Sequence, residues 1–401
     1  MKVVVLSSLA FSLVNFRGRL LEEMRLAGHE VVAVAPDDDP RVRAKLAEIG
    51  VRFRTVSMAR TGINVFADIG TIHALVSLLR TERPDAVVAY TQKPIIYGGI
   101  ACRIAGIDRF YALMSGLGYL FSEAASNRRL LRRIFCQLYR AGLKRARRIF
   151  VFNSDDRADM IAAGIVNPDA PVVEVPGSGV DLDRFQRAPL PEGAIHFLMI
   201  GRLMRDKGVW EYAQAAAMIA AHHPAVRFSL IGRVEQSNPT GLEEADLARL
   251  KQESPVDVID ETDDIPAYLA RSHVFVLPTY YREGLPRTIL EALAVGRPVI
   301  TTDTPGCRDA VRQSENGFLV PPRDAGALAE AMRTLISNRE LIQQMSQKSR
   351  LLAETVYDVR KVNALLMKEM GLRGPCRTAS DSEVSSAGHT LRAAPQTPRA
   401  V

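Results

Sequence analysis

The sequence predicts an α/β protein in which two doubly wound, parallel-sheet domains follow one another along the chain. Short continuous apolar runs rich in β-branched residues alternate with stretches of helical periodicity, which is typical of parallel strands covered on both faces by helices. The alternation restarts after RAPLPEG (187–193), a non-periodic stretch that contains Pro and Gly. A chain of 401 residues is long enough for two such domains.

The first half supplies five expected strands, with helical patterns between them. The strands are KVVVL (2–6), EVVAVA (30–35), DAVVAY (85–90), RIFVF (148–152) and VVEV (172–175). The helices include Arg19–Ala27, Asp68–Arg80 and Asn127–Arg145. We read the first run as a buried strand and not as a signal peptide, because serines interrupt it and no small-x-small cleavage site follows.

The second half repeats the pattern and closes with helices. The expected strands are IHFLMIG (195–201), VRFSLIG (226–232), VDVI (256–259), VFVLP (274–278), PVITTD (298–303) and GFLV (317–320). The expected helices are Trp210–His222, Glu243–Gln252, Pro266–Arg271, Pro286–Val295 and a long helical stretch over Ala325–Met370.

These elements define the expected domain boundaries. Residues 1–188 form the first domain and 189–355 the second, and a helix at 356–372 packs back on the first. Residues 373–401 contain no aromatic residue and are dominated by Ser, Thr, Ala, Pro and Gly, so they predict a disordered tail.

Composition excludes several classes of protein. The chain is 47% apolar and 24% charged, so it is neither disordered overall nor fibrous, and no apolar run approaches the ~18 residues of a membrane span. The four cysteines lie far apart, which argues against a disulfide framework or structural zinc and fits a reducing cytosol. Of the net charge of +7, an excess of eight positive charges lies in residues 1–190, where we expect an anionic partner.

The stretch 127–148 carries nine Lys/Arg and no acidic residue. Its leucines, isoleucine and phenylalanine recur at helical spacing, so one face is apolar and another basic. Two interpretations stay open: a packed helix with a solvated basic face, or contact with an anionic membrane surface. Nucleic acid is not expected, since aromatic residues make up only 6% of the chain and no binding module is recognisable.

The segment VFVLPTYYREGLPRTILEALAVGRPVITTD (274–303) is the most informative motif. Glu283 follows a strand in a loop, and Glu291 comes eight residues later, inside the next helix, with Pro286 at its first position. The carboxyl end of a parallel strand and the start of a helix form the crevice where ligands and phosphates bind.

A second motif, IGRLMRDKGVWEYAQA (200–215), places two cations at a strand-to-helix turn. The expected strand runs into Gly201-Arg202, and the basic loop that follows carries Arg205 and Lys207. A guanidinium and an ammonium group together can neutralise a diphosphate. A solvated basic turn is the alternative interpretation of this segment alone.

Together the two motifs resemble the retaining glycosyltransferases of family 4, and the resemblance extends to about residue 370. It includes FSLVNFRGRLLEEMRLAGHEV (11–31), KPIIYGGIACRIAGI (93–107), SGLGYLF (115–121), FNSDD (152–156), VPGSGVDLDRF (175–185) and NGFLVPPRD (316–324). The resemblance implies the GT-B arrangement, two Rossmann-like domains facing across a cleft. The most similar group adds sugars to undecaprenyl-diphosphate-linked saccharides of O-antigen, capsule or protein glycans.

The resemblance also implies roles for particular residues. Arg202 and Lys207 would bind the donor diphosphate, Glu283 the sugar hydroxyls and Glu291 the ribose hydroxyls of a UDP-sugar. Further residues expected on the donor side are Gly201, Gly232, Gly284, Leu285 and Pro286. Residues expected on the acceptor side, which would bind a polyprenyl-diphosphate-linked saccharide, are Arg17, Gly18, Gly116 and Gly118.

The chain departs from the family pattern at three places. Met114-Ser115-Gly116 stands where many members have a histidine, Gln92 where a Thr-His pair is common, and Asn15–Gly18 in place of a Gly-Gly loop. Transfer on the front face needs no enzymic base, since the leaving diphosphate oxygen can accept the proton. No metal or other cofactor is expected, and we assign Asp181-Leu182-Asp183 to structural capping.

The expected function is therefore a cytoplasmic hexosyltransferase, peripheral on the inner face of the bacterial cytoplasmic membrane. A nucleotide-sugar 2-epimerase shares the two-domain layout, and a nucleotide-sugar-binding subunit without catalysis would explain Ser115 in place of histidine. The basic helix and the Glu283–Glu291 pair argue against the epimerase. The presence of Glu283, Arg202 and Lys207 argues against the inactive subunit.

Overall fold

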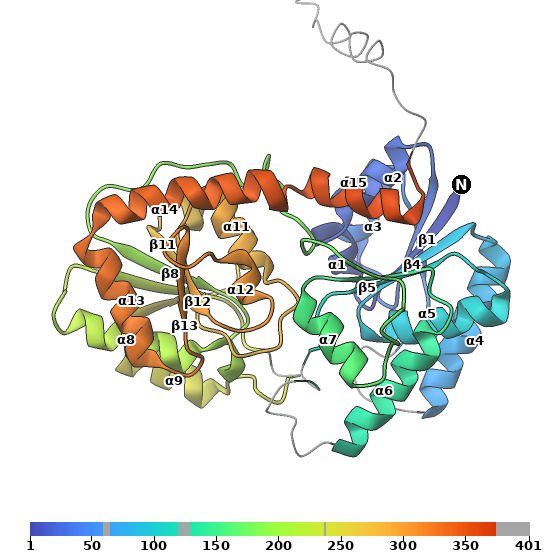
Figure 1. Cartoon of the computed structure of the whole chain (residues 1–401), viewed down its shortest axis with the longest axis horizontal. Helices are drawn as coiled ribbons and strands as arrows, with labels where there is room; N and C mark the ends of the chain where they lie inside the picture. The colour runs from blue at the N-terminus through green and yellow to red at the C-terminus, as the bar shows by residue number, and fades with distance from the viewer. Residues whose placement is uncertain (59–64, 119–120, 122–128, 236–237, 374–401) are drawn as a thin grey trace, which may run out of the picture.

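The computed structural model describes residues 1–58, 65–118, 121, 129–235 and 238–373, which form two α/β halves side by side (Figure 1). The first half holds a parallel sheet of order β3-β2-β1-β4-β5-β6-β7, and the second a parallel sheet of order β10-β9-β8-β11-β12-β13. Both orders reverse direction beside the first strand of the half, as a doubly wound fold does. The predicted fold class is confirmed.

The strands of the first sheet are mostly apolar and buried. They are β1 (Lys2–Leu6), β2 (Glu30–Ala35), β3 (Arg52–Thr55), β4 (Ala86–Tyr90), β5 (Phe110–Met114), β6 (Arg148–Val151) and β7 (Val172–Glu174). Two strands were not predicted: β3, which lies at the sheet edge and reads RFRT, and β5, a central strand of five buried residues. An edge strand can stay polar because only one of its sides is paired.

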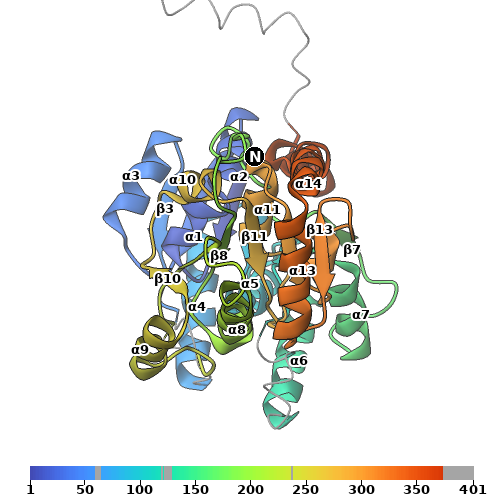
Figure 2. The ribbon, with the colours of Figure 1, turned by 90° about the vertical axis from the view of Figure 1, so that its left-hand side faces the viewer.

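Helices cover both faces of the first sheet. They are α1 (Ala10–Asn15), α2 (Gly18–Leu26), α3 (Pro40–Glu48), α4 (Val65–Glu82), α5 (Gln92–Ala105), α6 (Arg129–Leu143) and α7 (Ser154–Ala162). The predicted basic helix corresponds to α6, and Asn127 and Arg128 lie outside the described residues. In both views α6 reaches the lower end of the molecule (Figures 1 and 2).

The second half has the same construction. Its strands are β8 (His196–Ile200), β9 (Arg227–Ile231), β10 (Val256–Ile259), β11 (Val274–Leu277), β12 (Val299–Thr302) and β13 (Gly317–Val320). Its helices are the 3-10 helix η3 (Arg205–Lys207), α8 (Val209–Ala220), α9 (Glu244–Glu253), α10 (Ile265–Ala270), α11 (Arg287–Val295), α12 (Cys307–Ala310) and α13 (Ala325–Ser337). The central strands β8, β11 and β12 are buried throughout.

The expected long helix is divided into α13, α14 (Arg339–Leu352), a π-helical turn η4 (Ala353–Tyr357) and α15 (Val359–Met370). Asn338 and Asp358 break it, since each caps the next helix with its side chain. The last helix, α15, crosses to the first half (Figure 1). There the Asn363 amide donates to Glu23 at 3.0 Å and the Tyr111 hydroxyl to the Met370 carbonyl at 2.7 Å. The predicted tail lies outside the described residues, except for Arg373.

Candidate active site

Lys207 and Glu283 form an ion pair at the carboxyl end of the second sheet. Lys207 ends η3, which follows β8, and Glu283 lies in the loop after β11. Both side chains are nearly buried, with 11% and 13% of their surface exposed. The Thr279 hydroxyl also lies 3.5 Å from the carboxylate oxygen that meets Lys207. The structure therefore unites a cation and a carboxylate that lie 76 residues apart in the sequence.

Backbone contacts hold the two loops against each other. The carbonyl of Asp206 accepts hydrogen bonds from the Thr279 hydroxyl at 3.0 Å and from the amides of Tyr280 and Tyr281 at 2.9 and 3.0 Å. Gly208 has φ +78°, and a Cβ there would lie 2.1 Å from the Pro278 carbonyl oxygen. Only glycine permits this approach, so the turn after Lys207 fixes the distance between the two motifs.

Arg202 lies in the same loop cluster, but it is more exposed. Its guanidinium lies 5.9 Å from the centre of the Tyr281 ring, and the Lys207 ammonium lies 5.8 Å from the same centre. Arg202 also pairs with Glu235 at 3.7 Å, and 41% of its side chain is exposed. The Tyr281 ring thus brings together the two cations that the sequence analysis assigned to a diphosphate.

The remaining donor-side residues surround the same sheet edge. Gly201 and Gly232 follow β8 and β9, so they lie at adjacent strand ends. Pro286 precedes α11 as its N-cap and is not, as was predicted, the first helical residue. Its extended backbone (φ −63°, ψ 118°) lies outside the helical region, so the helix begins one residue later.

Glu291 lies on α11 and is buried together with Arg287. The Arg287 Nε lies 3.0 Å from the Glu291 carboxylate, and 16% and 11% of the two side chains are exposed. Burial raises the pKa of Glu291, and the Arg287 charge opposes that rise. Burial likewise lowers the pKa of Arg287. Each group thus depends on the other to keep its charge.

The loop that carries Glu283 lies directly against the first half. A Cβ on Gly116 would lie 2.6 Å from the amide nitrogen of Gly284, and one on Gly284 would lie 2.5 Å from the Ser115 carbonyl oxygen. The Asn153 amide donates to the Gly284 carbonyl at 2.6 Å. Leu285 is 8% exposed, and its side chain lies 2.6 Å from where a Cβ on Gly177 would be. The two halves therefore approach each other backbone to backbone beside Glu283.

The other acceptor-side residues lie on the facing edge of the first sheet. Gly118 faces the Tyr281 hydroxyl, 3.5 Å from where its Cβ would be. Gly18 begins α2, and Arg17, only 3% exposed, directly precedes that helix. The Arg17 guanidinium lies 5.2 Å from the Tyr90 ring centre, its Nε has no hydrogen-bond partner, and burial lowers its pKa to about 10.

Ion pairs connect the halves on the far side of the Glu283 loop. Arg282 pairs with Asp159 of α7, and Arg308 of α12 lies 3.1 Å from Asp155. Asp156, on the first turn of α7, has no exposed surface, and burial raises its pKa to about 7. Charged groups of both halves therefore meet next to the site.

Both aspartates of the D-x-D motif, Asp181 and Asp183, are paired with arginine side chains. One carboxylate oxygen of Asp181 accepts hydrogen bonds from the amides of Asp183 and Arg184 at 3.0 and 3.3 Å, and the other lies 3.2 Å from the Arg19 guanidinium. Asp183 pairs with Arg19 and Arg360. Among the described residues, no group of three His, Cys, Asp or Glu side chains is placed to hold a metal ion. The capping contacts account for Asp181, and the arginine pairs account for Asp183.

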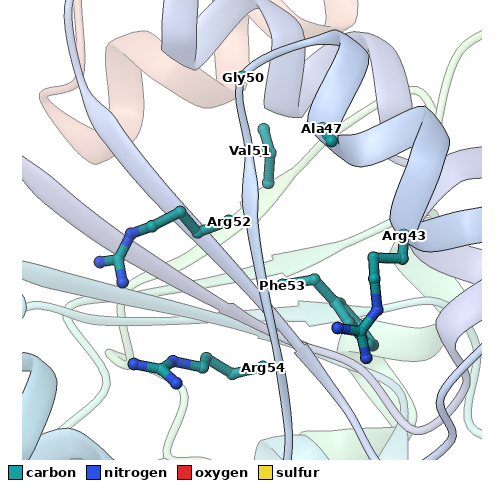
Figure 3. Close-up of a pocket in the computed structure, with 7 residues that line it drawn as sticks. All are labelled: Arg43, Ala47, Gly50, Val51, Arg52, Phe53 and Arg54. Carbon is teal, nitrogen blue, oxygen red and sulfur yellow. The ribbon is translucent and has the colours of Figure 1, made fainter.

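A separate cavity of about 520 Å³ lies at the edge strand β3 (Figure 3). Its lining includes Arg43, Arg52, Phe53 and Arg54 and none of the predicted site residues. Each of the three arginines is already paired with a carboxylate, of Asp38, Glu30 or Glu82. Because the charges of this cavity are satisfied within the protein, it is a weaker candidate for a substrate site than the interdomain site.

Several residues at the site were missed by the sequence analysis. The Asn153 amide donates to the Gly284 carbonyl, the centre of the Tyr281 ring lies 5.9 and 5.8 Å from the Arg202 and Lys207 cations, and Arg287 forms an ion pair with Glu291. The motifs FNSDD and YYREGLPR contain these three residues, but the sequence alone indicated no role for them. The Gly284 carbonyl that Asn153 binds lies in the other half, so this contact could not be found from local spacing.

The fold and the interdomain site define a glycosyltransferase of the GT-B type. The family model described as "Glycosyl transferase 4-like domain" matches residues 15–177, and the one described as "Glycosyl transferases group 1" matches residues 182–352. The two matches follow the two halves of the structure and cover most of the chain. The chain belongs to this family of glycosyltransferases.

Two curated relatives match most of the chain. One, from Campylobacter jejuni, is N,N'-diacetylbacillosaminyl-diphospho-undecaprenol alpha-1,3-N-acetylgalactosaminyltransferase; it is 24% identical over 85% of this chain and 91% of its own length. The other, from Escherichia coli, is UDP-Gal:alpha-D-GlcNAc-diphosphoundecaprenol alpha-1,3-galactosyltransferase; it is 27% identical over 72% of this chain and 75% of its own.

Solved structures share the fold. Anabaena HepE in complex with UDP and glucose superposes with a TM-score of 0.75 at 18% identity, over 92% of this chain and 99% of its own. Sucrose-phosphate synthase from Thermosynechococcus elongatus gives a TM-score of 0.76 at 19% identity, over 97% of this chain and 100% of its own. The expected GT-B arrangement is confirmed.

Proposed function

We propose that this glycosyltransferase transfers a hexose or N-acetylhexosamine, with retention, from a UDP-sugar to a polyprenyl-diphosphate-linked saccharide. The observation that carries the proposal is the buried Lys207–Glu283 pair, with Arg202 beside it and the backbone of Gly116 against the next residue of the loop. It combines a cationic site for a diphosphate with a carboxylate for sugar hydroxyls, at the boundary of the two halves.

The donor would bind along the carboxyl edge of the second sheet. The Glu291 carboxylate can accept from two ribose hydroxyls, and Arg202 and Lys207 would neutralise the diphosphate. Glu283 and Lys207 meet through a single carboxylate oxygen, which leaves the second oxygen and two ammonium N–H groups for substrate. The ion pair therefore orients both groups before the donor arrives.

In the reaction, the bond between the anomeric carbon and the diphosphate oxygen breaks, and the acceptor hydroxyl bonds to the same face of that carbon. The hydroxyl proton passes to the leaving diphosphate oxygen, so UDP and the extended saccharide are the products. Lys207 and Arg202 stabilise the negative charge that develops on the diphosphate. This route needs no base, which accommodates Ser115 where a histidine is common in the family.

Arg17 supports an anionic acceptor. The side chain is buried, and among the described residues no carboxylate forms an ion pair with it. A buried charge without a counter-ion is costly, so an anionic group arriving in the cleft would find a site there. The names of both curated relatives contain an undecaprenyl-diphosphate-linked substrate, which supports a lipid diphosphate as that group.

Helix α6 supports peripheral association with the cytoplasmic face of the membrane. Leu130 is 71% and Ile134 43% exposed, and Arg129, Arg132 and Arg133 lie exposed on the same helix. Apolar side chains between cations suit the interface of an anionic bilayer, where each cation contributes about 1 kcal/mol. No helix in the described part of the chain has the length and apolarity to cross a bilayer.

A transfer assay tests the proposal. The protein is incubated with UDP-sugars, with and without undecaprenyl-diphosphate-linked saccharide, and the products are separated and weighed by mass spectrometry. The proposal predicts UDP release and a heavier lipid-linked saccharide only when the acceptor is present, and neither product with Glu283→Gln. An epimerised donor without acceptor would support the 2-epimerase, and donor binding without turnover would support the inactive subunit.

A further inference from the structure

Arg287 contacts both halves of the protein. It is the first residue of α11, and its Nε lies 3.0 Å from the Glu291 carboxylate on the next turn. Its Nη1 donates a hydrogen bond to the carbonyl of Asn15, the last residue of α1 in the first half. The guanidinium also lies 5.2 Å from the centre of the Phe16 ring. One side chain thus connects the proposed ribose carboxylate to the corner between α1 and α2.

The planar fork of arginine explains how it can do this. The Nε and Nη groups of a guanidinium point in fixed directions, so a contact made by one nitrogen orients the others. The Phe16 ring, although 42% exposed, lies next to the cation, and the Asn15 carbonyl receives one of its N–H groups. When the first half is in place, the guanidinium is therefore fixed beside Glu291, 3.0 Å from its carboxylate as an ion pair, although the Nε itself donates no hydrogen bond.

We propose that Arg287 is a positioning residue that couples nucleotide binding at Glu291 to closure of the two halves. The inference rests on the proposed donor site, because it takes Glu291 as the carboxylate that receives the ribose hydroxyls. Coupling between two sites is reciprocal, so a nucleotide that binds Glu291 also favours the contact of Arg287 with Asn15 and Phe16. Binding of the donor would thereby draw the first half, with its acceptor-side residues, over the sugar.

The positive charge of Arg287 also affects the protonation of Glu291. The pKa of Glu291 is raised by burial, and the Arg287 charge opposes this. Without that charge the carboxylate would take up a proton at higher pH, and a protonated carboxyl accepts fewer hydrogen bonds from a diol. Arg184 also opposes the rise, but it is exposed and hydrogen-bonds to the Asp263 carbonyl at 3.3 Å, and among the described residues it forms no hydrogen bond or ion pair with Asn15 or Glu291. It is the matched control.

A double-mutant cycle tests the coupling, with UDP as the ligand in titration calorimetry. Arg287→Gln is expected to weaken UDP binding at least about tenfold, because removing one partner of a buried ion pair leaves the other charge uncompensated. Phe16→Ala, at an exposed ring of the other half, is expected to weaken it about two- to fivefold in the wild type and not further in the Arg287→Gln background. Arg184→Gln is expected to change affinity less than about twofold.

A pH series separates positioning from a merely structural role. In Arg287→Gln the loss of UDP affinity with falling pH should begin at higher pH than in the wild type, whereas Arg287→Lys, which keeps the charge, should retain the wild-type profile. Equal effects of Phe16→Ala in both backgrounds, or unchanged affinity in Arg287→Gln, would overturn the coupling alone. Failure of the wild type to bind UDP would overturn the proposed donor as well.

Discussion

Replacing Lys207 by methionine separates the two roles of the Lys207–Glu283 pair. Methionine keeps much of the apolar volume and removes the charge. If Lys207 stabilises the leaving diphosphate, its loss should cost about 2–4 kcal/mol of transition-state stabilisation, as with other preorganised electrostatic contacts. At 1.36 kcal/mol per tenfold change, kcat for transfer should fall about 30- to 900-fold, with a smaller change in donor KM.

The variant should also lose stability, because the Glu283 carboxylate would stay nearly buried without its partner. With 13% of that side chain exposed, the free energy of unfolding should drop by up to about 3 kcal/mol, the lower end for a broken buried pair. Lys207→Met/Glu283→Gln removes both charges. It should recover most of the stability but none of the activity.

The assays are steady-state UDP release with donor and lipid acceptor, and urea-induced unfolding of the wild type, each single variant and the double variant. A catalytic role predicts that stability and kcat respond differently across this set. If the double variant regains both stability and turnover, the pair is structural and the reasoning is refuted. Equal losses in kcat and donor affinity for Lys207→Met would confine Lys207 to binding the ground-state diphosphate.

Three further predictions concern separate groups. Glu291→Ala should weaken binding of UDP and of the intact donor; unchanged nucleotide affinity in calorimetry would contradict the ribose assignment. Changing Arg129, Arg132 and Arg133 to Gln should lower partition onto anionic vesicles by on the order of a hundredfold at low salt, about 3 kcal/mol in all, and added salt should mimic this; undiminished vesicle binding would leave α6 as a packed helix with a solvated face. His273 directly precedes β11 and is 3% exposed, and this burial lowers its pKa from 6.5 to about 4, so the unfolded chain binds the proton more readily. The stability that neutral His273 contributes is thus present above pH 6.5 and lost as pH falls towards 4. The free energy of unfolding, measured by chemical unfolding across this range, should therefore fall less steeply with pH in His273→Gln than in the wild type. An equal pH dependence in both proteins would contradict a lowered pKa of His273.

Much of the fold could be predicted because the buried strands leave a continuous apolar signal. Runs such as VVV in β1 or VFVL in β11 read as strands of a parallel sheet without any further information. The edge strand β3 has two arginines in four residues and so lacks an apolar signal. Ion pairs with Glu30 and Glu82 stabilise these arginine side chains instead. Those partners lie on other elements, so local sequence does not reveal them.

The breaks between the C-terminal helices are a second feature that the sequence alone did not predict. Apolar periodicity continues through Ala325–Met370, so it predicts helix throughout. The chain turns at Asn338 and Asp358, where side chains cap new helices, and the last of these packs on the first half. Where a periodic stretch is divided depends on this packing and on the caps together.

At the site, local motifs predicted the loops but not the contacts between them. The spacing of Glu283 and Glu291 placed one in a loop and the other on a helix, and the structure agrees. The pairing of Glu283 with Lys207, and of Glu291 with Arg287, follows from the meeting of two strand ends and from a single helical turn. The Arg287 contact with Asn15 depends on how the halves meet, and no single segment encodes that.

The central claim is that this protein extends a polyprenyl-diphosphate-linked saccharide by one sugar. The most direct test is mass spectrometry of the lipid-linked saccharides extracted from cells that carry the gene, lack it, or carry only the Lys207→Met allele. The account predicts that cells without the gene and cells with the allele both accumulate a species lighter by one hexose or N-acetylhexosamine. Identical lipid-linked saccharides in all three strains, with the protein present in the first and third, would contradict it.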